Sequence, residues 1–585
     1  MQAQLGRHEN ILLKQNKTNI QLENHKLKET LKTALCTKCN GSLNPSDYNS
    51  VEEYRLRLQI HRLTEELSKM TALAQRCLGR PIMSFDLSNS APIGQVPAAP
   101  PLPPVMPTIS LAGVLDVSQN QIENSPFLEL AEKAMEELTK LVSVNAPLWT
   151  QTGCEGGGGG AVEYLNLEEY IKSFPPCFET KPDKNSTRYA TRASGIVAAK
   201  SSSILNSLMN EAGNRNLQMM DAELQALSPI VPVWKVKFLR FCRQIAEGVW
   251  GMVDVSIETS GIVNCRRFPS GCVLQDILNG CSRVTWVEHL DCEENDVKVI
   301  HPLGVMSCSS SFGAQRWLAS LQRQCLCLAI ISSPPASTQD RASGMVSHFT
   351  KRSMVSMAHR MVRSFGFGLC STVHQWQLVQ AGETRLTVRN NMDNPGEPTG
   401  VVVCATNSVW MPLSHLRVFD FLSNKDRRGE WEDVHYTMPI QELARIDKSN
   451  DDELNRVSFL HTTVLIDKNN QKVVPIVQET QSDESGSMIV YGMVNLPVMQ
   501  VVMSGQDSSS VEILPNGFSI IPNIKRPATR ECVKEEDDSC MMTVAFQILT
   551  KNSPGNMNIS MELIEYINNL MSQRIQRIRS ALHCG

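Results

Sequence analysis

The chain has 585 residues, of which 42% are hydrophobic and 20% charged, and this predicts several folded domains, each with its own core. Its formal net charge of -4 excludes nucleic-acid binding through a generally basic surface. We expect an intracellular protein without a membrane span, because residues 1–10 lack an apolar signal core, no uncharged apolar run reaches about 18 residues, and the cysteines are scattered.

Residues 1–80 contain two series of heptads, which predict a zipper, a loop and a second zipper. A polar Asn24 at an a position favours a fixed register. The spacing also permits a helical hairpin within one chain, but the sustained heptads favour dimerisation. The residues expected at the dimer interface are Leu13, Ile20, Asn24, Leu27, Leu31, Leu56, Ile60, Leu63, Leu67 and Met70.

The loop between the two zippers carries Cys36 and Cys39, separated by two residues. This spacing suits zinc or a reversible disulfide. One chain supplies only half of a four-ligand zinc site, so two chains side by side would have to complete it. Disulfides between chains are the second interpretation, and simple loop cysteines are the third. No metal site is established by this pair alone.

A Pro-rich linker at 81–124 separates the zippers from a domain that we place at 125–331. Apolar residues with helical spacing begin that domain, running from Phe127 to Leu141. Three β-rich segments follow at 247–258, 265–277 and 282–291, and an amphipathic helix at 312–331 ends the domain. This order predicts an α+β helix-grip architecture, in which an antiparallel sheet packs against the long final helix.

A second linker at 332–352 leads to a C-terminal domain at 353–585. Here a helix comes first, strands such as 400–411, 488–494, 499–505 and 543–549 follow, and a long amphipathic helix comes last. Because this repeats the order of the preceding domain, we expect a second helix-grip-like α+β fold.

The sequence closely resembles the class IV homeodomain-leucine zipper (HD-Zip IV) transcription factors of plants. The resemblance is carried by QLGRHENILLKQN and CTKC in the zipper region, and by LQALSPIVPVWKVKFLRFCRQIAEGVW and NCRRFPSGC in the START domain. FGAQRWLASLQRQC resembles the closing helix of START, and DNPGEPTGVVVCATNSVWMP resembles the region after it. The resemblance implies a nuclear, dimeric transcription regulator with a lipid or sterol-like START ligand.

Three features depart from the family pattern. The family carries a homeodomain before the zipper, but the 585 residues contain no Trp-Phe-Gln-Asn-Arg-Arg motif. We therefore expect DNA binding only through a homeodomain-bearing partner or a missing N-terminus. The segment between Ile196 and Leu217 is shorter than in the family and predicts an incomplete START sheet. The second zipper has Ile60 where the family has Asn.

The candidates for contact with a START ligand are Asp254, Arg266, Arg267, Glu288 and Trp317. Strand alternation means that Arg266 and Arg267 cannot both face inward. The alternative is that these charged residues face solvent or form salt bridges. No HExxH, HxH or GxSxG motif occurs, so we expect a binding protein that is not an enzyme and has no cofactor. A lipid carrier or scaffold that does not bind DNA is the alternative function.

Overall fold

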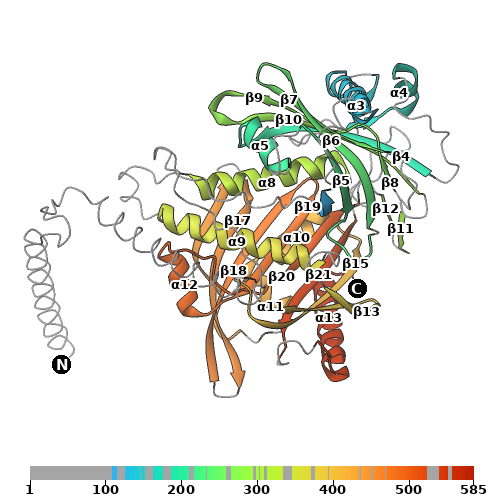
Figure 1. Cartoon of the computed structure of the whole chain (residues 1–585). Coiled ribbons are helices and arrows are strands. Elements are labelled where there is room, and N and C mark those ends of the chain that lie inside the picture. Colours follow the sequence, from blue (N-terminus) through green and yellow to red (C-terminus); the bar gives the residue numbers. More distant parts are fainter. Residues whose placement is uncertain are drawn as a thin grey trace, which may run out of the picture. The chain divides into compact units, whose positions relative to one another are not determined.

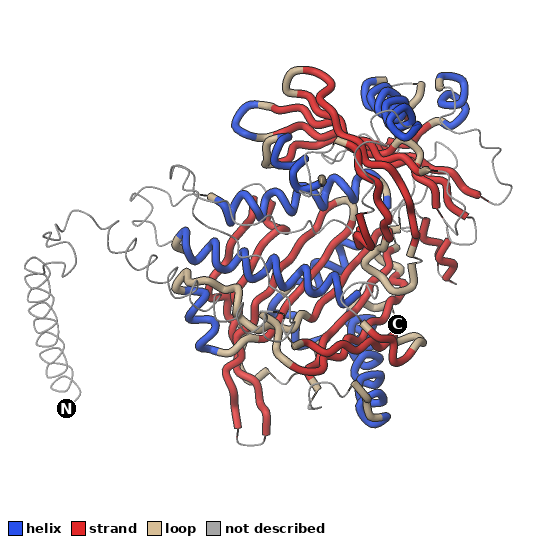
Figure 2. Tube along the Cα trace, viewed as in Figure 1, coloured by secondary structure: helices blue, strands red, loops and turns tan. Residues whose placement is uncertain are grey.

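The computed structural model describes residues 109–114 and most of the chain from 126 to 584. The longer gaps in the second part are 152–162, 175–185, 210–215, 258–264, 294–297, 308–311, 334–345, 370–375, 524–538 and 551–556. The expected dimerisation region at 1–80, with Cys36 and Cys39, lies outside the described residues. Figures 1 and 2 show that the described part consists of two large sheets with helices on their faces.

The first sheet has ten antiparallel strands within the described residues. Its order is β1 (Ile109–Val114), β5 (Leu217–Leu224), β6 (Trp234–Ala246), β7 (Val249–Ser256), β9 (Ser270–Asp276), β10 (Ser282–Glu293), β4 (Ser186–Val197), β3 (Glu163–Leu165) and β2 (Trp149–Gln151). The three-residue strand β8 (Cys265–Arg267) pairs with β10 beside β9. A separate hairpin is formed by β11 (Lys298–His301) and β12 (Gly304–Ser307).

Helices cover both faces of the first sheet. The amphipathic α3 (Pro126–Ser143) buries Met135, Leu138 and Leu141 against one face, where α4 (Leu167–Ser173) also packs. The other face, called the inner face below, packs against α5 (Ser201–Leu208) and the long α8 (Ala314–Ser332). A short 3-10 turn at Leu278–Gly280 joins β9 to β10.

The second sheet has nine antiparallel strands within the described residues. Its order is β13 (Gln377–Gln380), β14 (Arg385–Asn391), β15 (Gly400–Met411), β21 (Cys540–Leu549), β20 (Asn516–Pro522), β19 (Gly486–Met493), β18 (Asn470–Asp483), β17 (Asp452–Asp467) and β16 (Gln441–Ser449). One face packs against α10 (His415–Ser423), α11 (Arg428–Trp431) and α13 (Met561–Ala581). The opposite face packs against α9 (His348–Leu369) and α12 (Leu496–Met503).

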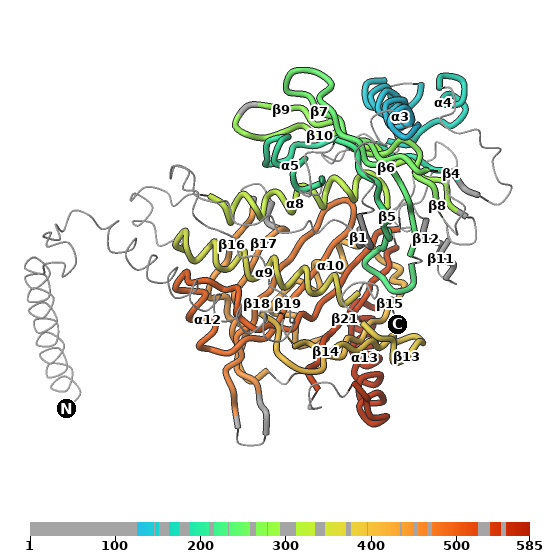
Figure 3. The backbone as a smooth tube through the Cα atoms, viewed as in Figure 1, coloured from blue at the N-terminus to red at the C-terminus, as the bar shows by residue number. Residues whose placement is uncertain are grey.

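The two sheets contact each other within the described part of the chain. The inner-face core of the first sheet includes Trp410 and Met541 from the second sheet. From α8, Arg316 donates to the carbonyl of Ser485 at 3.2 Å and Arg323 pairs with Asp483. Figures 1 and 3 show α8 running beside α9. Helix α8 therefore has one side in the first core and the other against the C-terminal domain.

The α+β class and the antiparallel sheets confirm the expectation from sequence. The C-terminal domain again consists of a helix, a sheet and a long final helix, and Ser560 caps α13 by accepting a hydrogen bond from the backbone N–H of Leu563 at 3.3 Å. The apolar stripe expected on the last helix packs against the sheet, since Ile567, Ile575 and Ile578 are all buried there.

Two local expectations were wrong. Residues 499–503 belong to helix α12 rather than a strand, and residues 504–505 form a turn after it, because Asn495 caps the helix, a proline occupies its first turn, and Met499 and Val502 share its buried side. Strand β1 lies within the expected linker at 81–124, where the segment ISLAGV has no proline and pairs with β5. Between Ile196 and Leu217 the described residues form helix α5, and the expectation of an incomplete START sheet stays a prediction.

Candidate functional site

Four charged side chains from four strands meet on the inner face of the first sheet. Arg240 comes from β6, Asp254 from β7, Arg267 from β8 and Glu288 from β10. Alternation along each strand places them on the same face as buried apolar neighbours such as Phe238. We call these four residues the inner-face charge group.

Ion pairs connect all four members of the inner-face charge group. Arg240 donates from Nε and Nη2 to the two carboxylate oxygens of Asp254, each at 2.8 Å. Arg267 donates from Nη1 to Asp254 and from Nη2 to Glu288, again at 2.8 Å. Arg240 also donates to the carbonyl of Leu208 at the end of α5, at 2.7 Å. One chain of contacts thus joins β6, β7, β8 and β10.

The inner-face charge group is buried, since Asp254, Arg267 and Glu288 are all 0% exposed. Burial raises the pKa of the Glu288 carboxyl above its ordinary value, although the Arg267 guanidinium acts in the opposite direction. Burial also disfavours the charge of Arg267, but the carboxylates of Glu288 and Asp254 outweigh it and raise the pKa of this guanidinium. The ion pair with Arg267 thus offsets only part of what burial costs the Glu288 carboxylate.

Aromatic rings surround the charge group. Trp286 of β10 and Trp317 of α8 stack with their ring centroids 5.5 Å apart and their planes 3° from parallel. The Arg267 guanidinium lies 5.0 Å from the ring centroid of Phe238 and 5.5 Å from that of Trp317. Trp286 also donates from its indole N–H to Glu288 at 3.3 Å. The polar group thus has apolar, polarisable walls on the sheet and on the closing helix.

Two atoms of the charge group keep unused hydrogen-bonding capacity among the described residues. Oε1 of Glu288 and Nε of Arg267 are buried and have no hydrogen-bond partner there. A buried polar atom without a partner costs free energy unless a ligand or water satisfies it. The site therefore offers one acceptor and one donor to a ligand.

A glycine allows the strands of this site to approach closely. Gly271 at the start of β9 has a φ of 134°, and a Cβ there would lie 2.1 Å from the carbonyl oxygen of Met252. Only glycine fits this position without moving β7 away from β9. The segment NCRRFPSGC thus supplies both Arg267 and the backbone contact that holds Asp254 beside it.

Comparisons with known proteins found two matching family models and several relatives. A family model described as START domain matches residues 200–327, and one described as PDF2-like, C-terminal domain matches residues 347–584. The Homeobox-leucine zipper protein HDG1 of Arabidopsis thaliana is 37% identical over 100% of this chain and 79% of its own length. The Homeobox-leucine zipper protein ROC4 of Oryza sativa subsp. japonica is also 37% identical, over 100% of this chain and 80% of its own.

The chain belongs to the class IV homeodomain-leucine zipper family. Its first sheet, with α5 and α8, contains the START domain, and its second sheet lies in the PDF2-like C-terminal domain. Among solved structures, the human StAR-related lipid transfer protein 5 is 14% identical with a TM-score of 0.25, over 34% of this chain and 95% of that one. At that TM-score the likeness supports no conclusion about this chain.

The structure brings together four of the five residues expected near a START ligand. Asp254, Arg267 and Glu288 lie in the charge group, and Trp317 covers it from α8. Arg266 lies on the other side of β8 and is exposed, so only one arginine of the pair faces inward, as strand alternation requires. The three charged residues are salt-bridged, which the sequence left open as an alternative.

Sequence reasoning missed Arg240, Phe238 and Trp286 in this HD-Zip IV chain. Arg240 follows the buried alternate positions Trp234, Val236 and Phe238 along β6, so its inward direction could be predicted from the alternation in WKVKFLR. Its partner could not, because the sequence does not show that β6 lies beside β7 with Arg240 opposite Asp254.

The dimerisation residues and the Cys36 and Cys39 pair of this HD-Zip IV chain fall outside the residues that the structure describes. Among the residues that are described, no cluster of three or more His, Cys, Asp or Glu side chains is arranged to hold a metal ion. In the same part of the chain, none of the helices combines the length and the apolar character that crossing a membrane requires.

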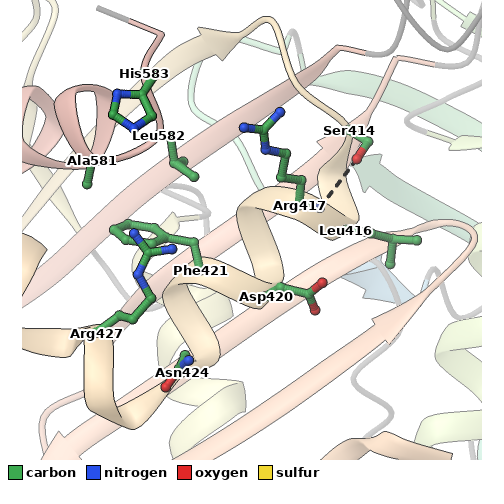
Figure 4. Close-up of a pocket in the computed structure, with 10 residues that line it drawn as sticks. All are labelled: Ser414, Leu416, Arg417, Asp420, Phe421, Asn424, Arg427, Ala581, Leu582 and His583. Atoms are coloured by element: carbon green, nitrogen blue, oxygen red, sulfur yellow. Dashed lines mark hydrogen bonds between the residues drawn. The ribbon is translucent and has the colours of Figure 1, made fainter.

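A separate pocket of about 590 Å³ lies in the C-terminal domain between α10 and the end of α13. Figure 4 shows Arg417 and Asp420 on α10, Arg427 beyond it, and His583 at the opposite wall. Arg427 pairs with Glu430 at 2.8 Å, and 41% and 43% of these two side chains are exposed. Solvent-exposed charges of this kind hold a ligand weakly. The inner-face charge group is therefore the stronger candidate site.

Proposed function

We propose that this chain is a transcription regulator of the HD-Zip IV type, in which the START domain binds a lipid or sterol-like ligand at the inner-face charge group. The observation that carries the proposal is the buried group itself, with an unused acceptor on Glu288 and an unused donor on Arg267. A ligand hydroxyl that accepts from Nε of Arg267 and donates to Oε1 of Glu288 would satisfy both atoms.

The remainder of the ligand would lie against apolar surface. The inner face around the charge group consists of buried apolar and aromatic side chains from the sheet and from α8. Such sites hold a ligand largely by apolar contact and orient it by a few polar groups. This division favours an amphipathic molecule with one polar end over a water-soluble metabolite, and it favours binding over catalysis.

The zipper residues support dimerisation, either of two copies or with HD-Zip IV relatives. The alignment with HDG1 spans this whole chain and so includes Leu13, Ile20 and Leu27. DNA contact would be made through the homeodomain of a partner or through a missing N-terminus. A role of this kind places the protein in the nucleus.

Lipid extraction tests the ligand. The purified 585-residue chain would be extracted with organic solvent, and the extract quantified by mass spectrometry against protein concentration. We expect close to one retained lipid or sterol per chain. A chain that remains empty, even after incubation with phosphatidylcholine vesicles containing sterol, contradicts a ligand-binding START domain and leaves a scaffold role.

Sedimentation tests the zipper. We expect the wild-type chain to sediment as a dimer and the triple variant Leu13→Ala, Ile20→Ala, Leu27→Ala as a monomer, because truncating one buried core side chain costs about 2 to 5 kcal/mol. The variant should still retain lipid, since the START core does not depend on the zipper. A dimeric triple variant would place self-association elsewhere. A lipid-bound chain that also fails to associate with relatives would favour the lipid carrier.

A further inference from the structure

Two thiols lie in contact in the START core. Cys265 of β8 and Cys292 of β10 are directly opposed in the antiparallel register, and their Sγ atoms are 2.8 Å apart. Both side chains are 1% exposed and belong to the inner-face core. This separation is closer than two non-bonded sulfur atoms normally approach, and longer than the roughly 2.05 Å of a disulfide bond.

The backbone at this position already has the spacing of a disulfide. Directly opposed residues of an antiparallel pair have Cα atoms about 4.5 to 5.5 Å apart, and disulfides span about 4.4 to 6.8 Å between Cα atoms. Both side chains also leave their strands on the same face. Bond formation therefore requires a small approach of the two sulfur atoms and no change in strand pairing.

A second pair of cysteines on the same face is too far apart to form a disulfide. Cys242 of β6 and Cys272 of β9 each pair with Met252, so strand β7 lies between them. Two strand spacings of about 4.8 Å place their backbones roughly 10 Å apart, beyond the reach of a disulfide. Burial also raises the pKa of Cys242 to about 11, which keeps that thiol protonated.

We propose that Cys265 and Cys292 form a thiol–disulfide site in the START domain, oxidised by hydroperoxides. One thiolate attacks a peroxide oxygen and becomes a sulfenic acid, and the hydroxide that leaves takes up one proton to become water. The second sulfur then attacks the sulfenic sulfur and releases a second water. Two thiols and one hydrogen peroxide thus give one disulfide and two waters, with two electrons passing from the sulfurs to the peroxide.

Reagent can reach the pair by local opening of a short element. Strand β8 has three residues and pairs with β10 alone in the described sheet, so few ladder hydrogen bonds hold it. The cost of that opening includes the ion pairs of Arg267 with Asp254 and Glu288. Because β8 also carries Arg267, a disulfide at Cys265 would hold that guanidinium beside Glu288 and oppose further opening.

The test uses the purified full chain and hydrogen peroxide. After exposure, remaining thiols are alkylated in denaturant, and the digest is searched for the Cys265 peptide linked to the Cys292 peptide. We expect this linked peptide in the oxidised wild type, its loss on treatment with dithiothreitol, and a Tm about 4 °C or more above that of the reduced protein. The readout needs no variant, so a folding defect cannot obscure it.

Variants then assign the effect. Cys265→Ser should abolish both the linked peptide and the rise in Tm, whereas Cys272→Ser, a matched buried cysteine on the same face, should keep both. Cys292→Ser provides a second route if Cys265→Ser folds poorly by circular dichroism. The proposal fails if both thiols of the wild type stay fully alkylatable under peroxide, if they are overoxidised singly, or if they link to other cysteines instead.

Discussion

The START sheet and the C-terminal sheet each bury a group of charges beneath helices, but the charges come from different elements. In START all four members of the group stand on strands, and the closing helix α8 contributes the aromatic Trp317. In one buried group of the C-terminal domain the charges stand on or beside helices, although a second buried pair, Lys448 with Glu479, joins strands β16 and β18. Arg428 lies on α11, Glu432 follows it, and Arg574 lies on the closing helix α13.

Contacts in the C-terminal group run between helix and sheet. Arg428 pairs with Glu432, donates to the side-chain oxygen of Gln478 on β18 at 2.9 Å, and lies 3.9 Å from the ring centroid of Tyr491 on β19. Arg574 donates to the hydroxyl of Tyr491 at 3.4 Å. These contacts fasten α11 and α13 to the sheet, whereas the ion pairs of the START group join strands to one another. The first arrangement fits a structural role and the second fits a ligand.

Removing the central arginine of the C-terminal group should have the largest effect. Arg428→Met leaves the buried Glu432 without its main partner and should lower the free energy of unfolding by about 3 to 5 kcal/mol. Arg427→Met is the matched control, since Arg427 is exposed and its pair with Glu430 contributes less than about 1 kcal/mol. Urea unfolding followed by tryptophan fluorescence measures both. If both variants lost the same free energy of unfolding, Arg428 would contribute no more to stability than the surface residue Arg427.

The pKa values of the two buried glutamates, Glu432 and Glu288, shift in opposite directions. Burial acts against the charge of Glu432, but Arg428 outweighs it and lowers the pKa of this carboxyl. Its stabilisation is therefore present above the unfolded pKa and is lost as the pH falls through the folded value. The raised pKa of Glu288 gives the reverse, a contribution that is present at low pH and lost as the pH rises through the folded value.

At neutral pH, Glu432→Gln should thus cost about 2 to 3 kcal/mol, and Glu288→Gln should cost less, because burial already disfavours the charge of Glu288. Chemical denaturation of both variants at pH 7 and pH 4.5 measures this. If Glu288→Gln proves as damaging as Glu432→Gln, the START charges are structural as well.

A smaller, pH-dependent loss of stability is expected at His289, on the face of the START sheet opposite the inner face. His289 is 0% exposed, stacks on Phe268 with centroids 4.8 Å apart, and burial lowers its pKa to about 3. The neutral ring is favoured, so its stabilisation is present above pH 6.5 and is lost as the pH falls toward 3. His289→Phe keeps the stacked ring but removes the titrating group. Between pH 7 and 4.5 the variant should therefore lose less unfolding free energy than the wild type, by on the order of 2 kcal/mol, and its Tm should fall less. Parallel curves would contradict a buried neutral histidine.

The smallest effect is expected at the contact between the two domains. Arg323 of α8 pairs with Asp483, and each side chain is 25% exposed. Asp483→Asn should therefore cost no more than about 1 kcal/mol. Scanning calorimetry should still show one transition, because apolar contacts of Trp410 and Met541 with the START core remain. A split into two transitions would mean that this pair holds the domains together.

Periodicity in the sequence predicted those helices and strands that have one buried side and one exposed side. Helices α3 and α13 and strands such as β7, β10 and β15 follow from apolar spacing, since each buries a defined side. Helix α12 did not follow, because its valines favour strands and only the Asn495 cap and the proline after it indicated otherwise. Strand β1 was hidden by the prolines around it.

The site was predictable residue by residue but not as a group. Alternation separated Arg267 from Arg266, and the family resemblance directed attention to NCRRFPSGC. The pairing of Arg240 with Asp254, and of Arg267 with both acids, depends on strand order β6, β7, β9, β10 and on β8 beside β10. That order results from long-range packing, which a single sequence does not display.

Native mass spectrometry of the purified chain tests the START ligand site most directly. Wild type, Glu288→Gln and Asp221→Asn would each be incubated with phosphatidylcholine vesicles containing sterol, re-isolated and weighed intact. Asp221 is the matched control, since it lies on β5 of the same sheet and pairs with Lys237 at 3.7 Å with 36% of its side chain exposed. We predict one bound ligand per chain for wild type and Asp221→Asn and a loss of at least about tenfold in occupancy for Glu288→Gln. Equal occupancy in all three proteins, or no bound ligand in any, would contradict a ligand site at the inner-face charge group.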